Sequence, residues 1–163
     1  MFSNKAYLRH PQPNDGLAVY QRVKNSPPLD LNSPYFYLVQ ASHFSSTCAL
    51  AEANGQVLGW VSGHIKPDNP AIYFLWQVAI SEAARGQGLA VKLIKFLLSQ
   101  PNFSKVSYLE TSITPSNQAS WALFTRLAQQ LNTPLNKSLL FSAKQLGGDE
   151  DEELATLGPF NLA

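Results

Sequence analysis

The chain has 163 residues, of which 45% are hydrophobic and 14% are charged, and its formal net charge is +1. This composition is typical of one globular domain and excludes a disordered chain. Because no apolar stretch approaches the roughly 18 residues that cross a bilayer, and because residues 1–6 do not begin a secretory signal, we expect a cytoplasmic protein with no membrane partner. The single cysteine, Cys48, excludes an intrachain disulfide and any multi-cysteine metal site.

The charges are unevenly distributed along the chain. All twelve Lys and Arg residues lie at or before Lys144, whereas five of the eleven acids are consecutive at residues 149–153. Residues 1–148 therefore combine twelve basic with six acidic residues, a net charge of +6. An acidic run of this kind is most simply a solvated loop.

The first half of the chain carries clear helix and hairpin signals. Asn14 or Asp15 can cap a first helix, and Ser33 followed by Pro34 is a strong start for a second one. Asn54-Gly55 is a hairpin turn signal, since both residues tolerate a positive φ. The predicted elements are a strand at 5–9, helices at about 15–25 and 34–44, and strands at 47–52 and 56–65.

The second half begins with a strong strand at 71–80, followed by glycines and a helix at about 89–100. A strand at 106–113 should lie beside the strand at 71–80, reached by a right-handed crossover. Thr114 is the expected cap of the next helix, which runs to about Leu131. Short strands are expected at 139–141 and 154–160. The whole order predicts a single α/β domain over residues 1–163, without internal repeats.

The connection between the strand at 71–80 and the following helix is the most informative segment. Its glycines allow backbone N–H groups to converge, and the helix N-terminus adds a positive dipole, so the loop suits a phosphate or pyrophosphate. It lacks the Lys-Ser/Thr of a P-loop and a Gly-x-Gly-x-x-Gly fingerprint, which weakens the nucleoside triphosphate and dinucleotide interpretations. The segment consists of Arg85, Gly86, Gln87, Gly88, Leu89 and Ala90.

This segment resembles the Gln/Arg-x-x-Gly-x-Gly/Ala signature of the GCN5-related N-acetyltransferases. A second segment, Asn117 to Phe124, is similar to the helix of that family whose Asn contacts the pantetheine arm. The resemblance implies a single-domain α/β acetyltransferase fold with a mixed, mostly antiparallel sheet flanked by helices. It also implies acetyl-CoA as co-substrate, with its pyrophosphate on the loop at 85–90 and further contacts from Asn117 and Phe124.

Several blocks are similar, more narrowly, to the L-2,4-diaminobutyrate acetyltransferases of ectoine synthesis. That similarity implies acetyl transfer to the γ-amine of this diamine amino acid by a cytoplasmic homodimer. The blocks are residues 28–38, 61–63, 74–79, 109–117 and 157–160.

The chemistry of acetyl transfer requires a positioned thioester, a neutral amine and a stabilised oxyanion. The backbone of Val78, Ala79 and Ile80 is expected to pair with the pantetheine amides and to serve the thioester oxygen. An alkyl amine has a pKa of roughly 10, so a proton must leave before attack. Asp30 and Glu110 are the candidate carboxylates for binding the cationic substrate, and either one, or a water held by them, is expected to take the proton.

Neutral side chains complete the predicted substrate site. Trp76, which a strand position more often places in a core, is a candidate wall of the pocket through its resemblance to the family block. Selection of the γ-amine over the α-amine requires the substrate's other polar groups to be clamped away from the thioester. The remaining predicted substrate contacts are Asn32, Gln77, Thr111 and Asn117.

Two positions depart from the family pattern. Phe124 stands where a Tyr is common and cannot donate a proton to the leaving thiolate, so Ser120, Tyr108, water or no donor remain the alternatives. Related enzymes carry a His in the stretch where this chain has Glu150. If that His closes over substrate, Glu150 must make an ionic contact instead, and the run at 149–153 becomes a lid or an electrostatic lure for a dication.

Other functions are less well supported. His10, His43 and His64 are too scattered for a metal site, and the basic residues lack the aromatic interleaving of a nucleic-acid interface, so neither partner is expected. Two alternatives to diaminobutyrate acetylation remain open. They are acetylation of another small diamine or polyamine, and a non-catalytic acyl-CoA-binding module.

Overall fold

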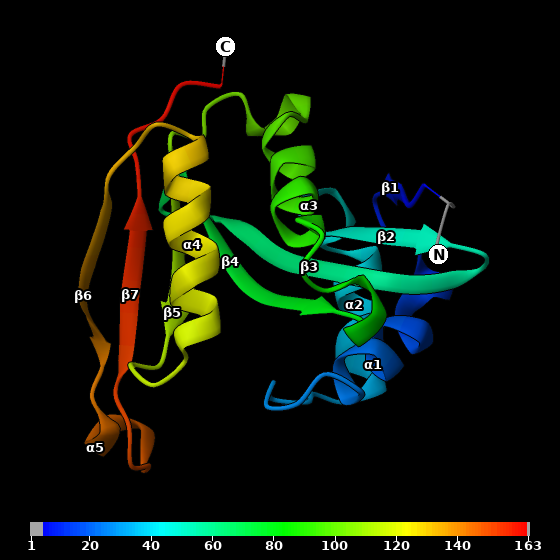
Figure 1. Cartoon of the computed structure of the whole chain (residues 1–163), viewed down its shortest axis with the longest axis horizontal. Coiled ribbons are helices and arrows are strands. Elements are labelled where there is room, and N and C mark those ends of the chain that lie inside the picture. The colour runs from blue at the N-terminus through cyan, green and yellow to red at the C-terminus, as the bar shows by residue number, and fades with distance from the viewer. Residues whose placement is uncertain (1–4, 163) are drawn as a thin grey trace. The chain divides into compact units, whose positions relative to one another are not determined.

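The computed structural model describes residues 5–162 (Figure 1). The strands in this range are β1 (Tyr7–Arg9), β2 (Ala49–Ala53), β3 (Gln56–Lys66), β4 (Asn69–Ile80), β5 (Tyr108–Ile113), β6 (Leu135–Phe141) and β7 (Glu152–Leu157). The helices are α1 (Gly16–Lys24), α2 (Pro34–Ser42), α3 (Leu89–Leu98), α4 (Gln118–Gln130) and α5 (Ala143–Leu146). Among these described helices, none combines the length and the apolar character needed to cross a membrane.

The strands form one sheet in the order β1-β2-β3-β4-β5-β7-β6. The pairs β1–β2, β2–β3, β5–β7 and β6–β7 are antiparallel. Strands β4 and β5 are parallel, with Ile72 opposite Tyr108 and Leu75 opposite Thr111, as expected for strands joined through a helix. The predicted α/β fold with a mixed, mostly antiparallel sheet is confirmed.

The described residues form two compact units, the first of which contains residues 5–64 and 77–104. Its sheet is covered on both faces, because neighbouring residues of a strand point to opposite sides. Trp60 belongs to the core beneath α1 and α2, whereas a Cβ on Gly59 would lie 2.9 Å from the Leu93 side chain of α3. The core cluster of this unit consists of Val19, Val23, Tyr37, Cys48, Leu50, Trp60 and Ala79.

The second unit contains residues 65–76 and 105–162. Strand β5 alternates between half-buried and buried side chains, and α4 lies along the strands of this unit in Figure 1. Helix α4 buries Phe124, Leu127 and Ala128. The Lys137 ammonium of β6 lies 4.2 Å from the centre of the ring of Trp121, another residue of α4. The sheet and helix of this unit are thus joined by both apolar and cation–π contacts.

Two local predictions are confirmed by geometry. Ser33 caps α2 by accepting a hydrogen bond from the backbone N–H of Phe36. Asn54 and Gly55 form the β2–β3 turn with φ values of 52° and 74°. Both signals are short sequence motifs, which is why the sequence alone located the helix cap and the turn.

Other boundaries were predicted wrongly. Thr114 does not cap α4, because its carbonyl accepts from Asn117 N in a tight turn, and Asn117 caps the helix instead. Strand β6 begins at Leu135 rather than Leu139, and its mostly exposed side chains show no alternation to reveal it. Strand β7 begins at Glu152, inside the acidic run, and α5 was not predicted at all.

Candidate active site

The loop between β4 and α3, in the first unit, has the geometry of an anion-binding turn. Gly86 and Gly88 have φ values of 76° and 72°, and a Cβ at either would meet nothing within 4 Å. Gly88 is the N-cap of α3, and no described side chain caps that helix. The first N–H groups of a ten-residue helix are therefore presented at an open, glycine-lined loop, which suits a pyrophosphate.

Two side chains of the predicted cofactor loop fold back onto it. Arg85 Nε donates to the carbonyl of Ile80 at 3.2 Å, and Gln87 Nε2 donates to the carbonyl of Ala83 at 3.2 Å. These bonds brace the loop around its glycines. The other predicted cofactor residues of this unit lie at its two ends: Val78, Ala79 and Ile80 close β4, and Leu89 and Ala90 open α3. The residues present therefore fit a bound nucleotide pyrophosphate.

A buried hydrogen-bond chain fixes the loop that carries Asp30 and Asn32. Tyr37 and Gln77 are buried, and the Tyr37 hydroxyl donates to Gln77 Oε1 at 3.2 Å. Gln77 Nε2 donates to the backbone carbonyl of Asp30 at 2.7 Å. Asn32 N donates to the Tyr37 hydroxyl at 3.4 Å. The structure thus brings together three predicted substrate residues, with the Asp30 side chain left exposed.

In the second unit, Glu110 already holds an ammonium group. Its Oε2 lies 3.6 Å from Lys66 Nζ, and the Glu110 side chain is only 14% exposed. The next residue, Thr111, is buried, and its hydroxyl donates to the carbonyl of Leu75 at 3.0 Å. Thr111 therefore ties β5 to β4, while Glu110 offers a partly desolvated carboxylate to a cation.

Trp76 and Phe124, also in the second unit, have opposite environments. Trp76 is 48% exposed, so the alternative of a core tryptophan is wrong. Phe124 is 3% exposed and belongs to the buried face of α4. A large half-exposed indole on a strand is available to contact a ligand.

Asn117 occupies the N-terminus of α4 with its amide held in one orientation. Its Oδ1 accepts from Ser120 N at 3.1 Å, which satisfies one of the free N–H groups of the helix. Its Nδ2 has no partner within residues 5–162. The cap uses the amide oxygen and leaves the Nδ2 donor, the polarity that a ligand carbonyl or hydroxyl requires.

The acidic run is largely committed to contacts within the second unit. Glu150 accepts from Ser116 N at 3.0 Å and from the Ser116 hydroxyl at 2.7 Å. Asp151 accepts from Ala143 N at the start of α5, and Glu153 lies 3.6 Å from Lys137. Residues 149–151 are exposed, as the interpretation as a solvated loop expects, but the end of the run is strand, since β7 begins at Glu152. Both carboxylate oxygens of Glu150 already accept hydrogen bonds from Ser116.

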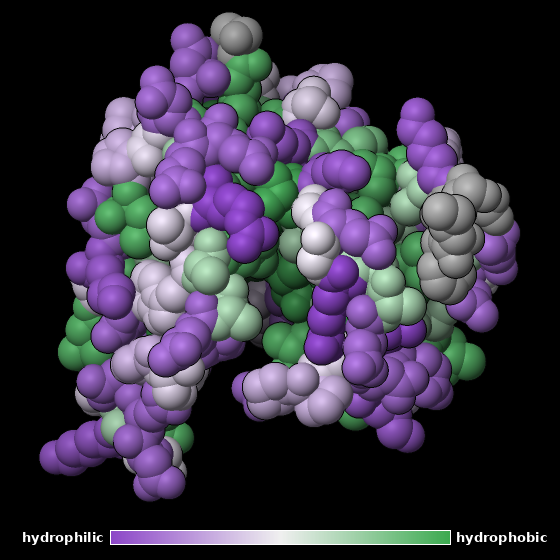
Figure 2. All heavy atoms as spheres, viewed as in Figure 1, coloured by the Kyte–Doolittle hydropathy of each residue, from purple (hydrophilic) through white to green (hydrophobic). Residues whose placement is uncertain are grey.

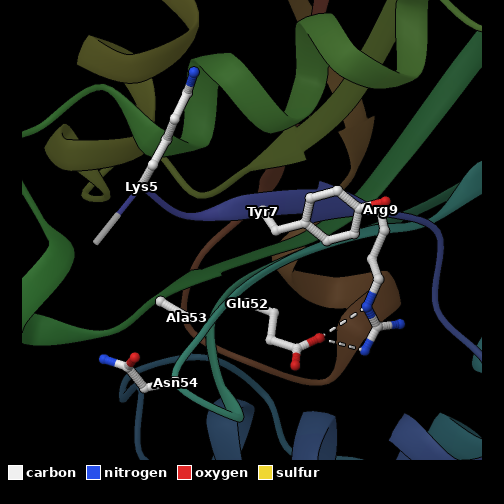
Figure 3. A pocket seen from close by; sticks show the side chains of 6 residues that line it. All are labelled: Lys5, Tyr7, Arg9, Glu52, Ala53 and Asn54. Atoms are coloured by element: carbon white, nitrogen blue, oxygen red, sulfur yellow. Dashed lines mark hydrogen bonds and ion pairs between the residues drawn. The ribbon is translucent and has the colours of Figure 1, made fainter.

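Figure 3 shows an open hollow in the first unit, in which the carboxylate of Glu52 is already paired with Arg9. Its volume is about 510 Å³, and Arg9 points across it to Glu52, with a distance of 2.8 Å between charged atoms. Arg9 also forms a two-armed contact with Asp15 and thereby holds the pKa of Asp15 below its ordinary value. This network is structural. The hollow is lined by Lys5, Tyr7, Arg9, Glu52, Ala53 and Asn54.

Sequence reasoning missed three residues that support the predicted site, namely Tyr37, Lys66 and Ser116. Tyr37 lies inside a block that resembles the family, but its spacing suggested only a helix. Lys66 ends a strand and Ser116 lies in a turn, positions where a polar residue is ordinary. No cluster of His, Cys, Asp or Glu able to hold a metal occurs in the described part of the chain.

Comparison with known proteins identifies the family. Residues 17–128 match the model of the acetyltransferase (GNAT) family. The chain belongs to this family. The diaminobutyric acid acetyltransferases of Halomonas elongata and Chromohalobacter salexigens are each 49% identical to it over 156 residues, which span 94% of this chain and 81% of each relative.

Solved structures of GNAT proteins agree with the fold. Diaminobutyrate acetyltransferase EctA from Paenibacillus lautus, in complex with L-2,4-diaminobutyric acid and coenzyme A, matches with a TM-score of 0.92 and 34% identity, covering 99% of both chains. The ribosomal-protein-S18-alanine N-acetyltransferase from Escherichia coli matches with a TM-score of 0.70 and 18% identity over 98% of this chain and 97% of that one. The second likeness is one of fold alone.

Proposed function

We propose that this protein transfers the acetyl group of acetyl-CoA to the γ-amine of L-2,4-diaminobutyrate, giving the Nγ-acetyl product used in ectoine synthesis. The observation that carries the proposal is the likeness over the whole chain to an enzyme solved with this diamine and coenzyme A. The 49% identity to relatives of the same name supports it. Acetyl-CoA supplies an activated thioester, and this chain's residues bind and orient the two reactants.

The β4–α3 loop is the proposed pyrophosphate site. The N–H groups at residues 86–90 and the N-terminus of α3 bind the diphosphate, and the backbone of Val78 to Ile80 pairs with the pantetheine amides. Asn117 adds its Nδ2 donor, since its Oδ1 is used to cap α4. The buried side chain of Phe124 supports α4, on which this contact depends.

Asp30 and Glu110 are the proposed partners of the substrate's ammonium groups. Asp30 has an exposed carboxylate on a loop whose backbone is anchored by Gln77. Glu110 already pairs with a primary ammonium, that of Lys66, which is the same chemical group as the substrate's. One of the two carboxylates, directly or through water, accepts the proton that the attacking amine must lose.

Trp76, Asn32 and Thr111 complete the proposed substrate site. The half-exposed Trp76 indole forms its wall, and the Asn32 backbone is fixed by Tyr37. Thr111 contributes through its bond to Leu75, which holds Glu110's strand against β4. Selection of the γ-amine requires that the substrate's carboxylate and α-amine be held away from the thioester.

We further propose that residues 1–163 act as a single N-acetyltransferase domain, in a cytoplasmic homodimer. The match of the family model across residues of both units supports one functional domain. The dimer and the location rest on the family resemblance. Light scattering coupled to size-exclusion chromatography measures the oligomeric state, and a monomer at assay concentrations contradicts the dimer.

The function is tested by acetyl-CoA consumption with diaminobutyrate, ornithine, lysine and spermidine in parallel. The product's acetylation position is read by NMR. We expect diaminobutyrate acetylated at the γ-amine to exceed the others by at least about 100-fold in kcat/KM, the scale that buried polar recognition allows. Preference for another amine identifies a different diamine acetyltransferase, and CoA binding without turnover of any amine favours a sensor.

A further inference from the structure

The acidic run braces the segment that leads into α4. Both carboxylate oxygens of Glu150 accept hydrogen bonds from one residue, Ser116, which donates its backbone N–H and its hydroxyl. Figure 2 shows hydrophilic surface over the end of this unit where Figure 1 places α5 and the turn into β7. A single residue that donates two charge-assisted hydrogen bonds to one carboxylate is held in position as well as in direction.

A second acid is linked to the same turn through a chain of three contacts. Glu153 pairs with Lys137, whose ammonium lies over the Trp121 ring. Trp121 Nε1 in turn donates to the carbonyl of Thr114 at 3.2 Å. Residues 114–117 are therefore held at Ser116 by Glu150 and at Thr114 by the chain of contacts that begins at Glu153.

The residue that follows Ser116 is Asn117, the proposed acetyl-CoA contact. Asn117 N donates to the Thr114 carbonyl at 3.1 Å, and its Oδ1 caps α4. Any movement of Ser116 therefore moves the backbone from which the Asn117 amide projects. We propose that Glu150 is a positioning residue, which holds the β5–α4 turn through Ser116 and so aligns the Asn117 amide for acetyl-CoA.

This role rests on the proposed function. It differs from a substrate contact in which ligand's binding a substitution of Glu150 should change, and in the direction of that change. Coenzyme A is an anion, so neutralising a nearby acid should strengthen its binding by electrostatics alone. A positioning role predicts the opposite, because the freed turn must be ordered when the ligand binds. A lure for a cationic amine predicts a change in the KM for diaminobutyrate instead.

The test compares Glu150→Ala, Ser116→Ala and the double variant, with Asp149→Ala as the matched control. Asp149 carries the same charge, is adjacent and exposed, and makes no hydrogen bond or ion pair within residues 5–162. Calorimetry gives the Kd for coenzyme A, and initial rates give KM for each substrate. Thermal melting establishes that every variant is folded.

We expect Glu150→Ala and Ser116→Ala each to raise the Kd for coenzyme A and the KM for acetyl-CoA roughly 3- to 10-fold, the scale of the net contribution of one hydrogen bond. The KM for diaminobutyrate should stay unchanged. The double variant should resemble either single one, because both remove the same contact. Ser116→Thr keeps both donors and should restore wild-type affinity, and Asp149→Ala should leave affinity unchanged or slightly tighter.

Three results overturn this role. Unchanged coenzyme A binding in Glu150→Ala, in a wild-type protein that does bind it, removes Glu150 from positioning while the proposed function stands. A raised KM for diaminobutyrate with unchanged coenzyme A affinity assigns Glu150 to the substrate instead. A wild-type protein that binds no coenzyme A overturns both the proposed function and this role.

Discussion

Gln77 Nε2 donates to the backbone carbonyl of Asp30 across a separation of 47 residues, at 2.7 Å. The other end of the Gln77 amide accepts from the Tyr37 hydroxyl. Both functional ends of this buried side chain are thus occupied by protein. The structure therefore gives Gln77 a role in holding the Asp30 loop.

Removing this amide should loosen the Asp30 loop. Gln77→Met keeps the side-chain volume but leaves the Asp30 carbonyl and the Tyr37 hydroxyl without their partner. We expect the KM for diaminobutyrate to rise about 10-fold, on the scale of one lost buried hydrogen bond, and the KM for acetyl-CoA to stay within twofold. Steady-state kinetics with each substrate varied in turn measures both.

Tyr20→Phe is the matched control, because Tyr20 packs edge-on against Tyr37. This substitution removes a hydroxyl that takes no part in the hydrogen bonds among Tyr37, Gln77 and Asp30. Its kinetics should match the wild type. Equal effects of Gln77→Met on the two KM values would indicate a general loss of structure and contradict the assignment.

The glycine loop makes a second prediction. Gly88 caps α3 at a φ of 72°, where a Cβ costs about 1 kcal/mol. Gly88→Ala should lower the free energy of unfolding by about that amount and raise the KM for acetyl-CoA several-fold, because the loop amides turn away from the diphosphate. Gly148→Ala is the control, since its φ lies outside the left-handed region and its Cβ would meet nothing within 4 Å.

A third prediction concerns the ion pair of Glu110. Glu110→Gln should lower kcat/KM for diaminobutyrate at least about 10-fold, because a carboxylate held beside an ammonium contributes more than 1.4 kcal/mol when partly desolvated. Lys66→Met removes the internal competitor, so the KM for diaminobutyrate should fall about twofold. Competition assays at low salt measure this change. A rise in KM would assign Lys66 to holding Glu110 in place.

Acid should weaken the first unit through Asp15. Arg9 lowers the pKa of Asp15 below its ordinary value of 3.8, so the stabilisation is complete above that value and is lost as pH falls through the pKa of the folded state. Asp15→Asn should therefore cost about 1–2 kcal/mol at pH 7 and progressively less below about pH 4. Urea unfolding at several pH values tests this. A constant difference down to pH 2 contradicts it.

Short sequence motifs predicted much of the fold. Ser33-Pro34, Asn54-Gly55 and the glycines at 86 and 88 each demand a particular backbone angle or cap, and the structure has each of them. Strand β6 was partly missed, since an edge strand with exposed side chains shows no period of two. The acidic composition of residues 152–153 likewise concealed the start of β7.

Polar contacts between residues far apart in the chain could not be predicted from the sequence pattern. The bonds of Gln77 to Asp30 and of Glu150 to Ser116 join residues 47 and 34 positions apart, and nothing local to either partner indicates the other. Family resemblance named Gln77 and Glu150 as substrate contacts because it transfers positions without their hydrogen bonds. The structure places both beside a backbone that they hold.

The single cysteine has a practical consequence for a protein that releases a thiol. Cys48 is fully buried, its Sγ lies 3.7 Å from Gln40 Oε1, and burial raises the pKa of the thiol to about 12. At neutral pH it remains protonated and unreactive, since the thiolate is the nucleophile. The folded protein should therefore form no mixed disulfide with released coenzyme A, and a chromogenic thiol reagent should report product alone, without background from the enzyme.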